Sequence, residues 1–355
     1  MRHAMRLAMS GLVPLMISNV ASAQIGEGLR ADEHAPIGVM GDHYHETGEK
    51  MFSYRYMTMS MQGNADGSTS LSPETIATAI PNRFFGVPGQ PPTLRVVPTE
   101  MKMDMHMFGF MYALSDRVTL MGMLNYISKE MEHTTFMGGT GTTVLGTFRV
   151  ENSGLGDTSA TALVRLYEDG NQKLHLTAGL SLPTGKIDAT AEVLAPSGMR
   201  PTLRMPYPMQ LGSGTYDLIA GLTYVRFYAG ASWGTQWRSV LRTGDNDDGY
   251  TLGDEHRLTG WYSRSLSPNV SWSARLEWYD RGNIDGIDPM IVAPVQTADP
   301  LRQGASRIDA AFGINYARPG GHRVAFEVAA PIDQDVDGPQ LEADWSLTVG
   351  YQYSY

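Results

Sequence analysis

The last residues of the chain alternate without a break between apolar and polar side chains, and the chain ends on an aromatic residue. One face carries Leu341, Ala343, Trp345, Leu347, Val349, Tyr351, Tyr353 and Tyr355, and the other carries Glu342, Asp344, Ser346, Thr348, Gly350, Gln352 and Ser354. A strand that is apolar outside and polar inside is the repeat unit of a transmembrane β-barrel. An edge strand of a soluble sandwich would also alternate, but nothing there favours a terminal aromatic residue. The pattern therefore predicts an all-β fold, a transmembrane antiparallel β-barrel.

The N-terminus carries the pattern of a cleaved secretory signal. Arg2, His3 and Arg6 are basic, residues 7–20 are apolar, and residues 21–23 form a small-residue cleavage site. The apolar stretch is too short to span a bilayer. We therefore expect residues 1–23 to be a signal peptide, residues 24–47 to form a periplasmic segment, and residues 48–355 to form the barrel in a Gram-negative outer membrane.

Composition limits the classes of partner. The formal net charge of -10 argues against nucleic acid. Cysteine is absent from the sequence, so thiolate metal ligands and disulfides are excluded. After the signal, no stretch approaches the ~20 apolar residues of a membrane helix. The expected partners are outer-membrane lipid, lipopolysaccharide, the barrel-assembly machinery acting through the C-terminal strand, and a small solute or metal ion.

Turn signals divide the mature chain into segments joined alternately by long and short connections. The long ones span residues 63–98, 133–154, 186–214, 242–254, 282–304 and 333–339, and the short ones lie at residues 115–117, 168–172, near 226, 266–269 and 317–321. Six long and five short connections predict about twelve strands, with both termini at the short-turn, periplasmic end.

Most of the predicted strands alternate like the last one. In one of them Val270, Trp272, Ala274, Leu276 and Trp278 are assigned to lipid, and Ser271, Ser273, Arg275 and Glu277 to the lumen. A shift of one residue would put Arg275 in the hydrocarbon, at a cost of about 2–4 kcal/mol near the midplane. This strand's orientation is therefore well determined.

Methionine dominates one face of the first three predicted strands. Of the 22 methionines, 14 lie between Met40 and Met137. Because Arg55 shares a face with Met57 and Met59, that face is assigned to the lumen. The predicted lumen-facing set, called the methionine wall below, comprises Arg55, Met57, Met59, Met61, Met101, Met103, Met105, Met107, Met111, Met121 and Met123.

The turn at residues 115–117 predicts how the second and third strands pair. Placing Leu114 opposite Val118 brings like faces together. The same register predicts three further pairs, namely Met111 with Met121, Met101 with Met131, and Lys102 with Glu130. The last is an opposite-charge cross-strand pair of the favourable kind.

Two interpretations of the methionine wall remain open. Methionine is unbranched and fills irregular interiors, so the wall can be explained by packing. Thioethers and imidazoles also suit Cu(I) and similar soft ions. His43, His45 and Met40 precede the first strand at the predicted periplasmic mouth and are the candidate metal ligands. Cu(I) would then be a transported ion, and no cofactor is required.

An acidic stretch near the C-terminus resembles part of a calcium loop. Asp333, Asp335 and Asp337 match the first half of the pattern, with Asp344 in place of the final Glu. No helices are predicted on either side, as an EF-hand would require. We interpret the stretch as a solvated extracellular loop, with calcium as a candidate ligand.

The chain contains none of the common catalytic motifs. G-x-S-x-G, H-E-x-x-H and P-loop patterns are absent from the sequence. His106 is assigned to the outer surface near the rim, but no serine is singled out as its partner. We expect a protein that is not an enzyme, with a structural or surface-enzyme barrel as an alternative.

Three features of the sequence resemble those of a known family. They are the segment 35–43, the methionine-alternating strands that follow it, and the stretch 181–185 at a predicted strand end. On these features the mature chain resembles the Gram-negative outer-membrane "transporter" proteins grouped with the meta-pathway phenol-degradation family. The resemblance implies a barrel with a transport role and, for members with a methionine-rich front half, an association with copper handling.

Together these observations predict a porin-like outer-membrane channel or transporter for a small solute, with a soft metal ion such as copper as one candidate. A passive pore for small hydrophobic or aromatic compounds is the first alternative. Twelve strands fall between the filled eight-stranded barrels and the open sixteen-stranded porins. The lumen is therefore expected to be narrow or partly plugged.

Overall fold

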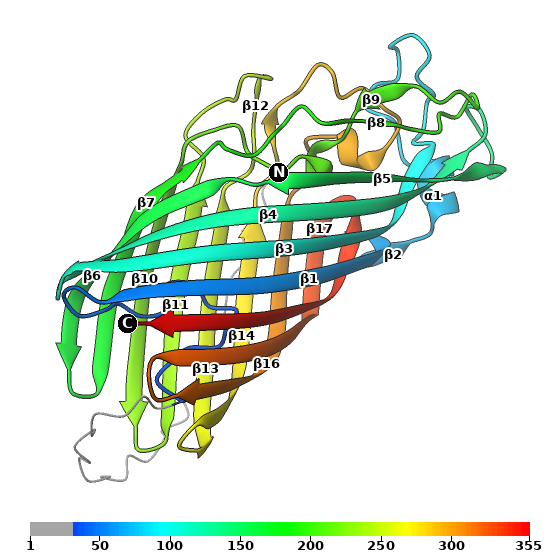
Figure 1. Cartoon of the computed structure of the whole chain (residues 1–355). Coiled ribbons are helices and arrows are strands. Elements are labelled where there is room, and N and C mark those ends of the chain that lie inside the picture. Colours follow the sequence, from blue (N-terminus) through cyan, green and yellow to red (C-terminus); the bar gives the residue numbers. More distant parts are fainter. Residues whose placement is uncertain (1–30) are drawn as a thin grey trace, which may run out of the picture.

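The alternating segments form a closed antiparallel β-barrel (Figure 1). The computed structural model describes residues 31–355, so the predicted signal peptide lies outside the described residues. The wall consists of β1 (Lys50–Gly67), β3 (Val96–Ser115), β4 (Val118–Phe136), β6 (Thr158–Asp169), β7 (Gln172–Leu182), β10 (Asp217–Tyr228), β11 (Ala231–Leu241), β13 (Glu255–Ser267), β14 (Val270–Arg281), β16 (Ala305–Arg318) and β17 (His322–Ser354). Neighbours in the wall pair antiparallel, and β1 pairs with β17 to close the ring. The predicted fold is confirmed.

The long strand β17 crosses the barrel twice. Its first part pairs with β16, from His322 opposite Arg318 to Val336 opposite Ala305. Its second part pairs with β1 and ends with Ser354 opposite Met51. The Ser354 amide donates to the Gly321 carbonyl at 3.0 Å, so the two ends of β17 lie at the same end of the barrel. The eleven labelled wall strands therefore make twelve antiparallel segments, in agreement with the predicted number.

The connections differ in length at the two ends of the barrel. The long ones carry β2 (Thr69–Leu71), α1 (Pro73–Ala79), β5 (Val144–Leu155), β8 (Thr190–Glu192), β9 (Thr202–Arg204), η1 (Tyr207–Met209), β12 (Tyr250–Thr251), β15 (Asp285–Gly286) and η2 (Gln296–Ala298). Long connections mark the extracellular end of such barrels and short turns the periplasmic end. Lys50 N donates to Tyr355 O at 2.9 Å, so the first strand begins and the last strand ends together at the short-turn end.

Two predicted connections differ from the structure. The turn predicted near Arg226 lies at residues 229–230, because Gly230 supplies the positive φ of 78° that this turn uses. The connection predicted over residues 133–154 is wrong in extent. β4 continues to Phe136 and β5 begins at Val144, where β5 pairs with β4 alone beyond the closed ring.

The outer surface of the wall is an apolar belt. Its exposed side chains include Phe108, Phe110, Leu120, Leu124, Leu176, Leu180, Leu222, Leu276, Phe312, Ile314, Phe326, Trp237, Trp278 and Trp345. The residues between them point inward and are often small or polar, such as Ser271 and Ser273. Alternation of this kind is what contact with lipid outside and water inside requires. The described part of the chain contains no helix long and apolar enough to cross a membrane.

The pairing of β3 with β4 agrees with the predicted register over most of its length. Met111 lies opposite Met121, Met101 opposite Met131, and Lys102 opposite Glu130. Next to the turn, a bulge places Ser115 rather than Leu114 opposite Val118. Lys102 and Glu130 do not bind each other in the structure. Lys102 binds Asp104 at 3.1 Å, and Glu130 binds Arg149 at 2.5 Å.

A bulge also changes which face part of the last strand presents. Trp345 lies opposite Ser60, but Ala343 lies opposite Met61, so Asp344 is the extra residue of the bulge. Leu341 and Ala343, which the alternation assigned to lipid, therefore line the lumen. Asp344 is exposed instead of facing inward. The predicted assignment to the lipid-facing side holds for Trp345, Val349 and Tyr351, which are exposed.

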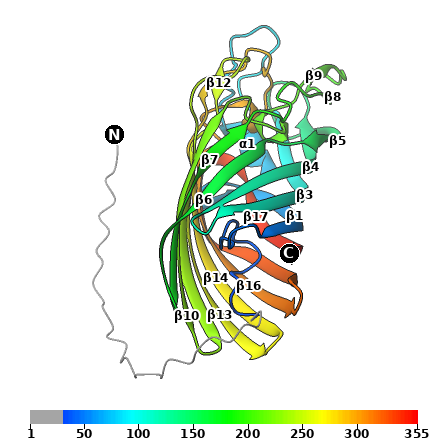
Figure 2. The ribbon, with the colours of Figure 1, turned by 60° about the vertical axis from the view of Figure 1, so that its left-hand side comes forward.

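Residues 31–45, called the N-terminal plug below, lie inside the periplasmic half of the barrel (Figure 2). Side chains of the wall donate to the plug's carbonyl groups. The bonds run from Ser271 to Ala31 at 2.7 Å, from Ser232 to Asp32 at 2.6 Å, from Arg323 to Ala35 at 2.5 Å, from Arg55 to Val39 at 3.3 Å and from Gln236 to Met40 at 3.0 Å. Residues 31–45, within the described part of the predicted periplasmic segment, thus fold back into the lumen, whose polar side chains satisfy backbone groups that lack strand partners.

Candidate functional site

A cavity of about 440 Å³ occupies the extracellular half of the lumen. It is lined by side chains of β1, β3, β4, β13, β14, β16 and β17 and by the connection that carries η1. Above it, the long connections pack on one another through buried Phe84, Tyr207, Tyr250, Ile291 and Val295. The cavity therefore lies between a roof of folded loops and the N-terminal plug.

The methionine wall forms continuous rows across β1, β3 and β4. Met61 lies opposite Met101, Met59 opposite Met103, Met57 opposite Met105, and Met51 opposite Met111. Met59, Met61, Met101, Met103 and Met131 line the cavity. Met205 and Met209, from the connection around η1, join Met101 and Met131 in one buried cluster. One side of the cavity is therefore largely thioether and methylene surface.

The periplasmic part of the methionine wall packs against the plug. Met107, Met111, Met121 and Met123 form a buried cluster with Tyr44, and Met40, Met57 and Met105 pack against it. Arg55 donates to the Val39 carbonyl. In this half of the barrel the methionines fill the space between the wall and an irregular segment, a role that suits their flexible side chains.

Arginine and tyrosine side chains dominate the side of the cavity formed by β13, β14 and β16, whereas Lys129 lies on β4 opposite Met103, within the methionine side. Among the lining residues six are basic, Lys129, Arg242, Arg257, Arg281, Arg302 and Arg307, and two are acidic, Asp157 and Glu255. The guanidinium carbon of Arg257 lies 4.2 Å from the centre of the Tyr279 ring, and that of Arg307 lies 5.4 Å from it. Basic side chains thus outnumber acidic ones among the lining residues, although Arg302 pairs with Asp299 at 3.2 Å and Arg307 with Asp309 at 2.9 Å.

The basic residues of the cavity differ in how they are neutralised. Arg242 pairs with Asp217 at 2.5 Å and with Glu255 at 3.0 Å. Arg257 pairs with Glu277 at 2.8 Å. In contrast, Lys129 donates to the carbonyl of Pro208 at 2.8 Å, and Arg281 donates to that of Gln303 at 2.8 Å. Carbonyl partners carry no opposite charge, so Lys129 and Arg281 lack the direct ion pairs that Arg242 and Arg257 make, although Glu255 lies opposite Arg281 on β13.

A network of buried ion pairs lies at the level of the plug. Arg275 binds Glu327 through two hydrogen bonds of 2.7 and 3.2 Å and binds Glu277 at 2.8 Å. A side chain at Gly38 of the plug would collide with this network, because an added Cβ would lie 2.2 Å from a Glu327 oxygen. The glycine lets the plug backbone lie directly against the ion pairs.

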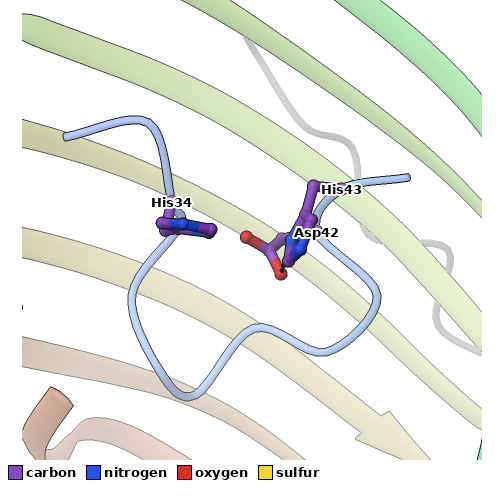
Figure 3. A group of neighbouring side chains, drawn as sticks. All are labelled: His34, Asp42 and His43. Atoms are coloured by element: carbon purple, nitrogen blue, oxygen red, sulfur yellow. Dashed lines mark hydrogen bonds and ion pairs between the residues drawn. The ribbon is translucent and has the colours of Figure 1, made fainter. Parts of the chain in front are cut away.

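The predicted metal ligands are only partly brought together. His43 lies beside Asp42 and His34, whose ligand atoms all lie within 4.8 Å of one another (Figure 3). The His45 ring is next to His43, with 4.9 Å between the ring centres. Met40 packs with the methionines, and its carbonyl accepts from Gln236. Sequence reasoning missed His34, because the turn that carries residue 34 back to residue 42 has no periodic pattern.

Burial strongly affects the ionisation of these groups. Desolvation lowers the pKa of His45 to about 3 and that of His34 well below its usual value. Burial alone would raise the pKa of Asp42, but the neighbouring His43, to which it is hydrogen-bonded, holds that pKa well below the ordinary range. Near neutral pH the plug therefore carries neutral His34 and His45 rings beside an ionised carboxylate.

The candidate calcium residues do not surround a common point. Asp333 and Asp335 are exposed on β17, where they lie opposite Ile308 and Ser306 of β16. Asp337 accepts from the Asn283 side chain at 2.6 Å. The backbone of β17 is extended and spreads these carboxylates along the strand. A calcium loop must instead wrap around its ion.

His106 lies on the outer surface, where its Nδ1 is 2.8 Å from the hydroxyl of Tyr54. It also lies against the ring of Tyr56, whose hydroxyl donates to Asp104 at 2.7 Å. The two tyrosines and the histidine form an aromatic and polar rim above the apolar belt, a common feature where such barrels meet the lipid headgroups.

Comparison with solved structures places this fold among outer-membrane barrels. The COG4313 outer membrane channel of Pseudomonas putida F1 superimposes with a TM-score of 0.56 at 14% identity, over 91% of this chain and 100% of that one. The β domain of the Bordetella autotransporter BrkA gives a TM-score of 0.45 at 15% identity, over 87% and 100% of the two chains. The P. putida toluene transporter TodX gives 0.42 at 10% identity, over 87% and 90%. No family model and no curated protein matches the sequence.

The closed barrel, the apolar belt and the likeness to the COG4313 channel identify the chain as an integral barrel of the bacterial outer-membrane type. The grouping with the meta-pathway phenol-degradation proteins stays a resemblance.

Proposed function

We propose that the protein is an outer-membrane channel for small organic solutes with a hydrophobic or aromatic body, and that it prefers those carrying a negative charge. The observation that carries this proposal is a cavity with two unlike walls. Its volume of about 440 Å³ suits a small organic molecule. Its methionine side offers apolar surface, and its basic side offers positive charge.

Charge and shape together favour an amphipathic anion. An aromatic carboxylate could lay its ring against Met101 and Met103 while its carboxylate meets Lys129 or Arg281. Guanidinium and ammonium groups bind carboxylates through short, charge-assisted hydrogen bonds. A mostly neutral hydrophobic pore would have no need of six basic residues in one cavity, since buried charge is costly without a partner.

The plug restricts this path at the periplasmic end. A solute that reaches the cavity from outside must pass the plug to enter the periplasm, either beside it or after the plug has moved. One pocket beside the plug, lined by Met40, Asp42, Arg55 and Met121 among others, has a volume of about 10 Å³, which is too small for an organic solute. We therefore propose that movement of the plug limits the rate of passage.

Ion selectivity in planar bilayers tests this function. In a salt gradient, the reversal potential of the reconstituted protein should have the sign of an anion-selective channel, and benzoate should carry current. The double variant Lys129→Gln/Arg281→Gln should shift the reversal potential towards zero, because it removes the two cavity charges that have carbonyl partners. A matched control is Lys102→Gln/Arg200→Gln, which removes two exposed cations outside the cavity and should leave the selectivity unchanged.

Cation selectivity, or equal reversal potentials for the cavity variant and the wild type, would refute the proposed preference. If the wild-type channel passes too little current, the same variants are compared in a barrel lacking the plug. The sign of the selectivity is expected to persist there, because the cavity charges belong to the wall.

A second candidate is passage of a soft metal ion such as Cu(I). The observation in its favour is the cluster of Met101, Met131, Met205 and Met209, with Met61 packed against it. Leucine keeps the apolar volume of methionine but has no sulfur. In Met101→Leu/Met103→Leu, benzoate current should be retained under our proposal, whereas copper passage would be lost under the alternative.

A further inference from the structure

We propose that the N-terminal plug binds a divalent transition-metal ion through His34, Asp42 and His43. This site lies in the plug rather than in the cavity and is independent of the solute that the channel carries. His34 and His43 stand at the two ends of a loop, and Asp42 lies between their rings (Figure 3). An ion held there would join the ends of the loop that rests on the barrel wall.

The loop is already closed by the residues around the site. The Ala35 amide donates to Asp42 Oδ2 at 3.0 Å, and the Val39 amide donates to the Pro36 carbonyl at 2.9 Å. The rings of His34 and His43 meet edge to face with 4.9 Å between their centres. The ligand set is therefore held in place by backbone bonds before any ion binds, which reduces the entropy lost on binding.

The hydrogen bond between His43 and Asp42 holds the two groups at a separation that one ion can bridge. His43 Nδ1 lies 3.0 Å from Asp42 Oδ1. An ionised carboxylate can only accept, so Nδ1 carries the hydrogen while the ion is absent. An ion that binds both Asp42 and His43 would replace this hydrogen, which moves to Nε2 or is released to solvent.

Unpartnered nitrogen atoms are the second, independent observation. Nδ1 of His34, Nε2 of His43 and Nε2 of His45 are buried and have no hydrogen-bond partner among residues 31–355. Buried polar atoms without a partner are rare in native proteins. Three such atoms lie on neighbouring histidines of one short segment, so no hydrogen bond among the described residues holds these nitrogens away from an ion.

The donor atoms indicate the class of ion. Imidazole nitrogen with carboxylate oxygen suits Zn²⁺, Cu²⁺ or Ni²⁺, whereas Ca²⁺ and Mg²⁺ prefer oxygen ligands alone. In a tetrahedral zinc site, neighbouring ligand atoms lie roughly 3.3 Å apart, so the donors must converge from the separation of up to 4.8 Å seen here.

His45 has its Nδ1 at 3.3 Å from Glu49 and is placed to complete the set. The positive charge of Arg323, which binds Ala35, would repel a bound ion. The negative charge of the Asp42 carboxylate offsets this repulsion.

Zinc retention by the full-length protein tests the site. The protein, purified without a polyhistidine tag, is mixed with Zn²⁺, desalted and analysed by mass spectrometry for metal content. The wild type should keep about one zinc ion per chain, and His34→Ala/His43→Ala should lose it. The matched control is His106→Ala/His322→Ala, which removes two histidines that contact tyrosines on the outer surface and should keep the ion. Ca²⁺ and Mg²⁺ should not be retained.

Folding is checked by the slower migration of the heated protein on gels. If the double variant fails to fold, His34→Ala alone is used, because no hydrogen bond of its ring is seen among residues 31–355. It should weaken zinc binding by at least about tenfold. Absence of zinc from the wild type, equal zinc in the plug variants, or equal loss in the outer-surface control would overturn the proposal.

Discussion

Deletion of residues 27–45 is expected to raise the single-channel conductance severalfold. The deletion removes the plug from the periplasmic half of the lumen and leaves the first wall strand, which begins at Lys50, intact. Without the plug, the lumen at this level is bordered by small polar side chains such as Ser232, Ser263, Ser271 and Thr223, together with Arg55, Arg323 and Gln236, which would lose their bonds to the plug. Conductance follows the narrowest section of a water-filled pore, so removal of the obstruction should have the largest effect of any change inside the barrel.

Assembly of the shortened barrel is monitored by its heat-dependent migration on gels. A second variant keeps residues 27–45 in place but replaces Ser232 and Ser271 by alanine. Loss of these two bonds to Asp32 and Ala31 should loosen the plug and raise the conductance less than the deletion does. A folded deletion variant with the conductance of the wild type would show that the plug does not obstruct the path.

Removal of Tyr351–Tyr355 is expected to abolish assembly in the outer membrane. These residues close the ring, since Tyr351 lies opposite Tyr54 and Ser354 opposite Met51. The backbone groups of Lys50 and Tyr355 also exchange two hydrogen bonds, of 2.9 and 2.8 Å. Their loss would leave two unpaired strand edges in the hydrocarbon, where water cannot satisfy the backbone.

The truncated protein should be missing from outer-membrane fractions and should show no heat-dependent shift on gels. Tyr355→Phe is the matched control, because it keeps the aromatic end and the backbone bonds and should assemble normally. Normal insertion of the truncated chain would contradict the idea that the last strand closes the barrel.

The sequence predicted the wall of the barrel because strand alternation is local. Each lumen-facing residue lies two positions from the next, so Arg275 and Glu277 on one side and Leu276 and Trp278 on the other determine the orientation of β14 without knowledge of its neighbours. Even the pairing of β3 with β4 could be predicted, since a short turn leaves few registers open. The bulges could not be predicted from the sequence. The extra residue at Asp344 leaves no local signal, yet it reverses the faces of Leu341 and Ala343.

The plug and the two walls of the cavity depend on contacts between distant residues. Residues 31–45 bind the barrel mostly through backbone carbonyls. Every sequence has these carbonyls, so no residue pattern predicts the contacts. The methionine wall was visible as a stripe on three consecutive strands. The basic residues were not, because Lys129 on β4 and the pair Arg257 and Arg281 on the β13–β14 hairpin face one cavity only when the ring closes. His34 was missed because the turn that brings it beside Asp42 has no periodic pattern.

The most direct test of the account is to fasten the plug to the barrel and measure solute flux. The natural chain has no cysteine, so Asp32→Cys/Ser265→Cys introduces a unique pair at a contact where the native side chains are 2.6 Å apart. After treatment with a short, reducible thiol cross-linker, benzoate flux into proteoliposomes should fall well below that of the untreated variant, and reduction should restore it. Unchanged flux through a barrel shown to be fully cross-linked would contradict the claim that solute passes through the lumen by displacing the plug.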